Sequence, residues 1–168
     1  VIEKMGGSIS ITNQTIQSGE PIGDLTATSS SLSATTIEGA MIPLLIDELP
    51  ILALAACFAK GETEIKDAAS LRVKETDRIT TTSNELRKMG ANIRETTDGM
   101  IITGVSALRG APTSSHGDHR LAMTLGIAGM IAQGKTEIAY PDSTRISYPG
   151  FWSDLATIAP GVLFSNEH

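Results

Sequence analysis

Residues 87–93 read RKMGANI, and residues 3–9 read the similar EKMGGSI, so this motif recurs at a spacing of 84 residues. A second pair, AKGETEI at residues 59–65 and AQGKTEI at residues 132–138, recurs at a spacing of 73 residues. Two motifs repeated in the same order indicate an internal duplication, and the spacing is much longer than that of a solenoid repeat. The sequence therefore predicts a duplicated α/β unit.

Each copy is predicted to contain a helix that ends at a glycine and leads into a strand. A basic residue in the last helical turn, followed by Met and Gly, is typical of a helix C-terminus. Residues 8–12, SISIT, alternate polar and apolar side chains as a half-buried strand does, and residues 91–95 are their counterpart. The dipeptide Asp98-Gly99 predicts a hairpin turn into a strand at residues 100–103. Further strands are expected at residues 36–39, 63–66 and 136–139, and helices at residues 47–59, 75–89, 121–132 and 149–158.

The composition is that of an ordinary globular domain, with 168 residues, of which 40% are hydrophobic and 19% are charged. The longest apolar run, residues 49–59, is about half of a membrane span, so a buried helix is expected and no membrane partner. The net charge of −6 argues against nucleic acid as the main partner. We predict one mixed α/β (α+β) domain over residues 1–168.

The single cysteine and the distribution of basic residues constrain the chemistry. Cys57 lies inside the apolar run, which favours a buried side chain over a reactive thiol, and one cysteine cannot form an internal disulfide or a cysteine-based zinc site. Residues 1–59 contain one basic side chain, Lys4, whereas eight lie within residues 72–120. This concentration of cations fits either an anion-binding site or solvated helices.

Two acidic and basic motifs could carry chemistry. In IDELP, residues 46–50, Asp47 could cap the following helix or accept a proton from a substrate hydroxyl, and the two roles are compatible. In RVKETDR, residues 72–78, a helix would place Lys74 and Arg78 on one face with Glu75 beside Arg78. Such a group at a helix N-terminus can bind an anion, although an exposed helix with several ion pairs would have the same sequence.

A third motif, SSHGDHR at residues 114–120, precedes the expected helix at residues 121–132. Asp118 is the default helix cap, and metal binding is disfavoured because no cysteine or distant histidine completes a ligand set. Arg120 opposes the dipole of the first helical turn, a cost that a bound anion would offset. No Walker A, GxGxxG or GxSxG motif is present.

Together, Asp47, RVKETDR and Asp118-His119-Arg120 make the chain similar to the C-terminal part of the 5-enolpyruvylshikimate-3-phosphate synthase family, also called 3-phosphoshikimate 1-carboxyvinyltransferase. The resemblance extends over essentially all 168 residues. It implies βαββαβ repeats with buried helices, as in the inside-out barrel of enolpyruvyl transferases. The chain would be the C-terminal part of a two-domain enzyme, with its first repeat truncated at Val1, and would need its own N-terminal domain.

The resemblance also implies a reaction and roles for individual residues. The family transfers the enolpyruvyl group of phosphoenolpyruvate to the 5-hydroxyl of shikimate 3-phosphate in aromatic amino acid biosynthesis and releases phosphate. Asp47 would accept the hydroxyl proton, and Glu75 would give and retrieve the methylene proton. No metal or organic cofactor is implied, and the location would be the cytoplasm. The implied substrate-binding residues are Asp47, Lys74, Arg78, His119 and Arg120, with Lys74 on shikimate 3-phosphate, the two arginines on phosphoenolpyruvate, and His119 in support.

Two positions depart from the family pattern, and two other functions stay open. Ile146, with Arg145 beside it, stands where some members carry a lysine that binds phosphoenolpyruvate, and Ser70 stands where some use asparagine. The alternatives are a UDP-N-acetylglucosamine enolpyruvyl transferase, whose reactive cysteine lies on a loop, and a non-catalytic ligand-binding module of the same fold. Because the other domain would supply part of the site, we expect the isolated chain to be inactive.

Overall fold

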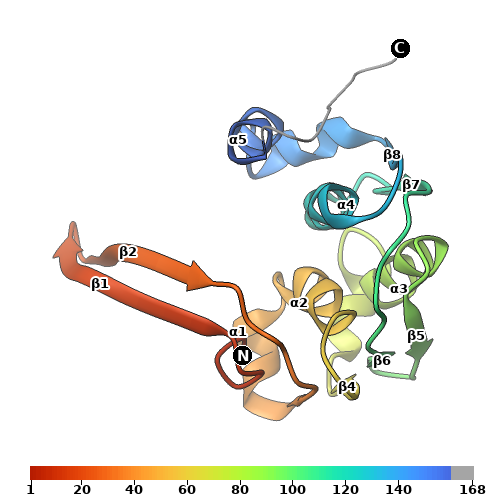
Figure 1. Cartoon of the computed structure of the whole chain (residues 1–168), viewed down its shortest axis with the longest axis horizontal. Coiled ribbons are helices and arrows are strands. Elements are labelled where there is room, and N and C mark those ends of the chain that lie inside the picture. Colours follow the sequence, from red (N-terminus) through yellow and green to blue (C-terminus); the bar gives the residue numbers. More distant parts are fainter. Residues whose placement is uncertain (160–168) are drawn as a thin grey trace.

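The computed structural model describes residues 1–159, and the last nine residues of the expected domain lie outside the described part. The chain is a mixed α/β structure (Figure 1). The strands are β1 (Ser8–Gln17), β2 (Glu20–Thr28), β3 (Thr36–Ile37), β4 (Glu62–Ile65), β5 (Asn92–Glu95), β6 (Met100–Thr103), β7 (Pro112–Ser114) and β8 (Glu137–Ala139). The α-helices are α1 (Ile42–Leu45), α2 (Leu49–Ala56), α3 (Arg78–Lys88), α4 (His119–Ile131) and α5 (Phe151–Ile158). The 3-10 helices are η1 (Gly39–Met41), η2 (Ala69–Val73) and η3 (Pro141–Ile146).

The strand pairing confirms the duplication that the sequence motifs predict. In the first copy β3 and β4 pair in parallel with α2 between them in sequence, and in the second copy β7 and β8 pair in parallel around α4. Strand β1 and its counterpart β5 begin 84 residues apart and each enters an antiparallel hairpin. The central sheet has the order β3-β4-β6-β5, so it joins elements of both copies.

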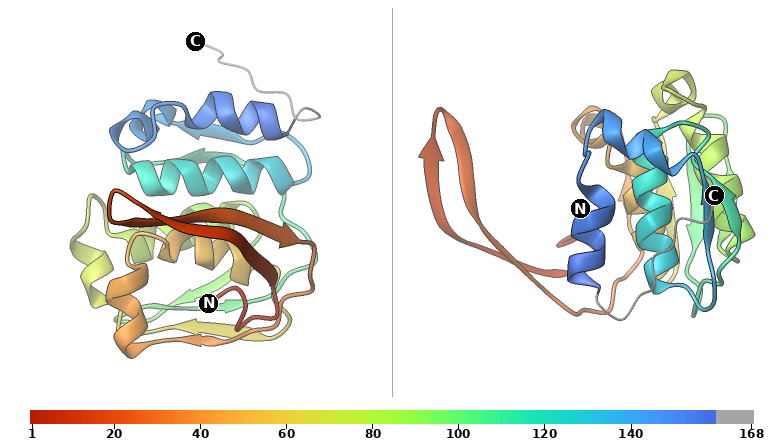
Figure 2. Two further views of the ribbon diagram at one scale, coloured as in Figure 1. Left: turned by 90° about the vertical axis from the view of Figure 1, so that its left-hand side faces the viewer. Right: turned by 90° about the horizontal axis from the view of Figure 1, so that it is seen from above.

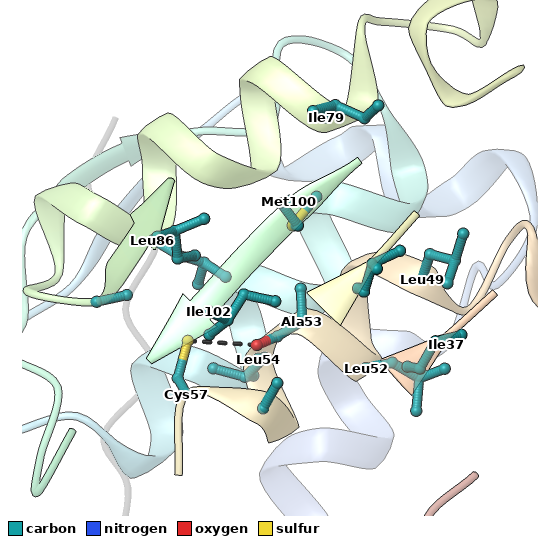
Figure 3. Packing of buried hydrophobic residues seen from close by; sticks show 14 of the residues in the cluster. Ile37, Leu49, Leu52, Ala53, Leu54, Cys57, Ile79, Leu86, Met100 and Ile102 are labelled. Atoms are coloured by element: carbon teal, nitrogen blue, oxygen red, sulfur yellow. Dashed lines mark hydrogen bonds between the residues drawn. The ribbon is translucent and has the colours of Figure 1, made fainter. Parts of the chain in front are cut away.

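The two internal helices, α2 and α4, pack against each other and supply much of the core. Figure 3 shows Leu49, Leu52 and Ala53 of α2 among side chains from the sheet and α3. Close packing explains one glycine of α4, because a Cβ at Gly126 would lie 2.9 Å from the ring of Trp152. Within residues 1–159 no single helix is long and apolar enough to cross a membrane, and only the bent pair Gly39–Leu45 and Leu49–Ala56 meets the length and composition required.

Cys57, at the C-terminus of α2, is a buried core residue, as the sequence predicts. Its side chain is fully buried, and its Sγ lies 3.3 Å from the carbonyl oxygen of Ala53 (Figure 3). Burial raises the pKa of the Cys57 thiol to about 12, so the reactive thiolate is disfavoured.

The start of α3 differs from the prediction. The helix begins at Arg78 and not at Glu75, because the side chain of Asp77 accepts a hydrogen bond from the backbone N–H of Thr80 at 3.0 Å and caps it. Lys74 and Glu75 therefore lie in a short connection between η2 and α3, off any helix. The prediction that Lys74 and Arg78 share a helical face is wrong.

The strand predicted at residues 8–12 is part of a long hairpin that extends away from the rest of the chain (Figures 1 and 2). The strand expected at residues 8–12 continues to Gln17 and pairs with β2, a strand that was not predicted from the sequence. A register shift between Thr12 and Thr15 interrupts the alternation of side chains along β1. All residues of β2 are exposed, including Leu25 at 64%.

Candidate active site

A buried arginine at the first turn of α3 joins three carboxylates that are distant in sequence. The side chain of Arg78 is 1% exposed. Its Nε donates to Asp118 Oδ2 at 2.8 Å, its Nη1 to Asp47 Oδ1 at 2.9 Å, and its Nη2 to Glu75 Oε2 at 2.7 Å. Burial alone would lower the pKa of the guanidinium, but these carboxylates hold it above its ordinary value. The ion pairs thus tie together the starts of α2, α3 and α4.

Asp118 connects this group to the N-terminus of α4. As the sequence predicts, it caps the helix, because Oδ1 accepts from the backbone N–H groups of Arg120 and Leu121 at 2.9 and 3.4 Å. Its other oxygen also accepts a hydrogen bond from Thr76 Oγ1 at 3.2 Å. The side chain is fully buried, which alone would raise the pKa of its carboxyl, but the hydrogen bonds from Arg78 and the helix hold that pKa below its ordinary value.

Arg120, in the first turn of α4, faces the beginning of α2. Its Nη2 lies 3.4 Å from Asp47 Oδ2 and its Nη1 3.5 Å from Glu48 Oε1. These contacts are long, and within residues 1–159 the buried Nε of Arg120 has no hydrogen-bond partner. The sequence suggests that a bound anion offsets the unfavourable interaction of Arg120 with the dipole of α4. In the structure, carboxylates of the chain itself offset part of this cost.

Asp47 lies between the two arginines. The hydrogen bond from Arg78 is the main cause that lowers the pKa of Asp47, and the charges of Arg120 and Lys74 lower it further. The lowered pKa keeps this carboxylate ionised and thus able to accept a proton, although as a weaker base than an unpaired aspartate. Its side chain is 42% exposed, so a ligand can reach it.

A hollow of about 260 Å³ opens beside Asp47 and Arg120. Its lining combines three charged side chains with mostly apolar and aromatic side chains from α2, α4, the segment before α5 and the first residue of α5. It is lined by Asp47, Glu48, Ile51, Arg120, Met123, Thr124, Ile127, Tyr148 and Phe151.

The structure places the other candidate residues around this group with fewer contacts. Glu75 is 46% exposed, and Lys74 is exposed with no side-chain hydrogen bond or ion pair within residues 1–159. His119 is 8% exposed, and its Nδ1 is buried without a partner among the described residues. In the described part of the chain, no three His, Cys, Asp or Glu side chains are grouped as metal ligands.

Ile146 and Ser70, the two positions that depart from the family pattern, have no hydrogen bond or ion pair with the Arg78 group among the described residues. Ile146 is the last residue of η3 and is 69% exposed. The neighbouring Arg145 is 74% exposed and pairs with Asp142 at 3.3 Å. It does not line the hollow beside Asp47. Ser70 is an exposed residue of η2. Within residues 1–159, none of these side chains has a contact that assigns it to the site.

Two carboxylate roles were not predicted from the sequence. Asp118 was expected only as a helix cap, and Glu48 was not singled out. The cap motif was visible in the sequence, but a contact between Asp118 and Arg78 joins residues 40 positions apart and depends on the tertiary fold. The sequence does contain one signal for a nearby anionic group, because Arg120 places a positive charge at the start of a helix.

The buried carboxylate predicts acid-sensitive stability. The folded-state pKa of Asp118 lies below its ordinary value of 3.8, so its contribution is present above that value and is lost as pH falls through the depressed folded pKa. We expect the free energy of unfolding, measured by urea titration, to fall as pH is lowered past 3.8 and to keep falling until the carboxyl is protonated in the folded state. An Asp118→Asn variant should show a shallower fall. Equal slopes for the two proteins would contradict this assignment.

Comparison with known proteins supplies independent information on family and fold. The family described as EPSP synthase (3-phosphoshikimate 1-carboxyvinyltransferase) matches residues 1–155. Proteins named 3-phosphoshikimate 1-carboxyvinyltransferase from Roseiflexus sp. and Salinibacter ruber are 55% and 47% identical over 94% and 95% of this chain. The chain spans only 36% and 37% of those two proteins.

Solved structures agree with the sequence comparisons. EPSP synthase from Acinetobacter baumannii superposes with a TM-score of 0.87 at 36% identity, covering 94% of this chain and 37% of that one. The enolpyruvyl transferase NikO from Streptomyces tendae has a TM-score of 0.67 at 16% identity over 93% of this chain and 33% of its own, a likeness of fold alone. The predicted α/β fold of the enolpyruvyl transferase type is confirmed.

Proposed function

Because the chain belongs to the EPSP synthase family, we propose that it contributes part of an active site that joins phosphoenolpyruvate to the 5-hydroxyl of shikimate 3-phosphate. The products are 5-enolpyruvylshikimate 3-phosphate and phosphate. The observation that supports this best is that Asp47 and Glu75 both accept hydrogen bonds from Arg78, at 2.9 and 2.7 Å. Two carboxylates able to transfer protons are thereby held at one place, next to cations that suit anionic substrates.

The proposed reaction proceeds by addition and elimination. The hydroxyl oxygen bonds to C2 of phosphoenolpyruvate while Glu75, which must be protonated at the start of the cycle, donates that proton to the C3 methylene, and Asp47 accepts the hydroxyl proton. Elimination then breaks the bond between C2 and the phosphate oxygen, and Glu75 removes a proton from the new methyl group. The proton held by Asp47 leaves with the phosphate. Both carboxylates are exposed enough to reach a ligand, at 42% and 46%.

The anionic groups of the substrates require cations. Arg120 is the best-supported ligand for phosphoenolpyruvate, because its two ion pairs are long and its Nε has no partner in residues 1–159. Arg78 is buried and holds three carboxylates, so its proposed contact with phosphoenolpyruvate requires that the ligand replace one of them. Exposed Lys74 would bind the 3-phosphate, and His119 would donate or accept a hydrogen bond at the same site.

The same proposal includes the organisation of the parent protein. We place this chain at the C-terminal side of a two-domain, cytoplasmic enzyme of aromatic amino acid biosynthesis, with an incomplete first repeat in its own domain. Support comes from the duplicated motifs and from relatives of which the matched segment covers only 36%. The other domain would supply further cationic and hydroxyl side chains for both substrates.

The isolated 168-residue chain is expected to show no measurable turnover, because the substrate contacts of the other domain are missing. The test is release of phosphate from phosphoenolpyruvate in the presence of shikimate 3-phosphate. The full-length polypeptide that contains this chain serves as the positive control. Steady-state release of phosphate by the isolated chain would contradict the proposal that the site is shared between two domains.

The rival transfer to UDP-N-acetylglucosamine has less support. Its family uses a reactive cysteine on a loop, whereas Cys57 is buried at the end of α2 and its thiol has a raised pKa of about 12. Competition between shikimate 3-phosphate and the nucleotide sugar, in the full-length polypeptide, separates the two functions. If the nucleotide sugar binds to the full-length polypeptide and shikimate 3-phosphate does not compete with it, the rival function is favoured.

A further inference from the structure

The connection between η2 and α3 carries two proposed functional residues, Lys74 and Glu75. Residues 74–77 have no regular secondary structure, and the side chains of Lys74 and Glu75, like that of Val73 at the end of η2, are exposed to solvent. Within residues 1–159, no backbone N–H of Lys74, Glu75 or Thr76 donates to a backbone carbonyl. Its conformation is therefore fixed by side chains. Within the connection, Glu75 accepts from Arg78 at 2.7 Å and Thr76 donates to Asp118 at 3.2 Å, and further contacts are made at its two ends.

Arg72 holds the first end of the connection. Its Nε and Nη2 donate to the carbonyl oxygens of Thr97 and Thr96 at 2.8 and 2.6 Å, in the turn between β5 and β6. Its Nη1 donates to Asp77 Oδ2 at 2.8 Å and to Thr80 Oγ1 at 3.2 Å. The planar guanidinium thus ties η2 to the sheet and to the start of α3 at once.

Asp77 holds the second end and uses its two oxygens for different partners. Oδ1 accepts from the backbone N–H of Thr80 and caps α3, whereas Oδ2 accepts from Arg72. The Arg72–Asp77 pair therefore closes the segment 73–76 into a loop whose ends are both anchored. Neither residue lines the hollow beside Asp47.

We propose that Arg72 and Asp77 are positioning residues, which hold Lys74 and Glu75 in place by closing the loop at residues 73–76 without touching substrate. The inference rests on the proposed function, because that function assigns proton transfer to Glu75 and phosphate binding to Lys74. Holding reactive groups in a fixed geometry before the substrate arrives avoids an ordering cost during the reaction. A displacement of about 1 Å can reduce the rate about a hundredfold.

The Asp77→Asn substitution separates the two roles of this side chain. The amide oxygen can still cap α3, but the NH₂ group meets Arg72, so two donors face each other and the loop is released. Order parameters measured by ¹⁵N relaxation on this chain should fall at residues 74–76 from about 0.85 to below about 0.6. In the full-length polypeptide, kcat should fall about tenfold to a hundredfold. The KM for shikimate 3-phosphate should rise, while that for phosphoenolpyruvate should stay within about twofold.

Arg87→Gln is the matched control. Arg87 also ties α3 to β5, donating to the carbonyl oxygen of Ile93 at 2.7 Å and pairing with Glu95 at 3.3 Å, and its exposure of 36% is close to the 29% of Arg72. Arg87 shares Glu95 with Arg72, whose Nη1 lies 4.0 Å from Glu95 Oε2, but within the described chain its own contacts do not include residues 73–76. This variant should leave the loop order and both KM values unchanged even where it lowers the thermal midpoint.

The outcomes distinguish the positioning role from the function on which it rests. Unchanged order at residues 74–76 in Asp77→Asn, or equal loosening in Arg87→Gln, would overturn the positioning role. A loosened loop with unchanged kcat would leave the positioning role intact and contradict proton transfer by Glu75. Arg72→Lys, which can reach one partner but lacks the planar fork, provides a second test if Asp77→Asn does not fold, and it should loosen the same residues.

Discussion

Replacing Asp118 by alanine is expected to lower the free energy of unfolding of this chain by about 3–5 kcal/mol. The substitution leaves the guanidinium of Arg78, 1% exposed, without the one partner that is itself fully buried. It also removes the cap of α4, a further cost of about 1 kcal/mol. A folded domain is typically stable by about 5–15 kcal/mol, so the loss should be plain in urea unfolding followed by circular dichroism.

Two further variants test the cause of this loss. Asp118→Asn retains an oxygen that can cap α4 but removes the negative charge. Its free energy of unfolding should therefore lie between those of the wild-type protein and the alanine variant. Asp142→Ala removes a surface ion pair with Arg145, whose side chains are 80% and 74% exposed, and should cost less than about 1 kcal/mol. An Asp118→Ala protein no less stable than Asp142→Ala would contradict the central role of the Arg78 group.

The local parts of this fold are predictable because backbone chemistry determines them. Each of the two Lys-Met-Gly motifs ends at a position where the backbone adopts a positive φ angle, which is 88° at Gly6 and 92° at Gly90. Glycine adopts this conformation without steric cost, so the motif marks the same turn of the chain before a strand in both copies. The alternation at residues 8–12 likewise predicts a strand, since side chains of successive strand residues point to opposite faces.

The boundaries and the extra hairpin strand were less predictable because long-range or competing interactions decide them. The residues at 74–77 are compatible with a helix, yet Asp77 caps α3 and Arg72 holds the preceding segment against the turn after β5. Four of the charged residues proposed for the site, Asp47, Glu75, Arg78 and Arg120, are linked by hydrogen bonds, but of these only Asp47 and Arg120 line the hollow. The sequence does not show that Asp118 also pairs with Arg78. The carboxylate of Asp118 caps α4 with one oxygen and accepts from Arg78 with the other.

The substitution Glu75→Gln in the full-length polypeptide is expected to reduce kcat by about 10²–10⁴-fold, because an amide cannot donate and retrieve the methylene proton. Its size and shape match the glutamate, and a side-chain oxygen can still accept from Arg78 Nη2, which lies 2.7 Å from Glu75 Oε2. The KM values for both substrates should therefore change by much less than kcat. Steady-state phosphate release measured over a range of both substrate concentrations gives these constants separately.

Glu137→Gln provides the control for this measurement. Glu137 is in β8, its side chain is 63% exposed, and it pairs with Lys135 at 3.1 Å, far in sequence from the Arg78 group. Removing its charge should leave kcat unchanged, so a general effect of lost negative charge can be separated from lost proton transfer. Because a methylene proton must be added and later removed, the Glu75→Gln protein should also fail to exchange solvent deuterium into C3 of phosphoenolpyruvate. Normal turnover by that variant would exclude Glu75 as the acid and favour a binding module that has kept the family fold.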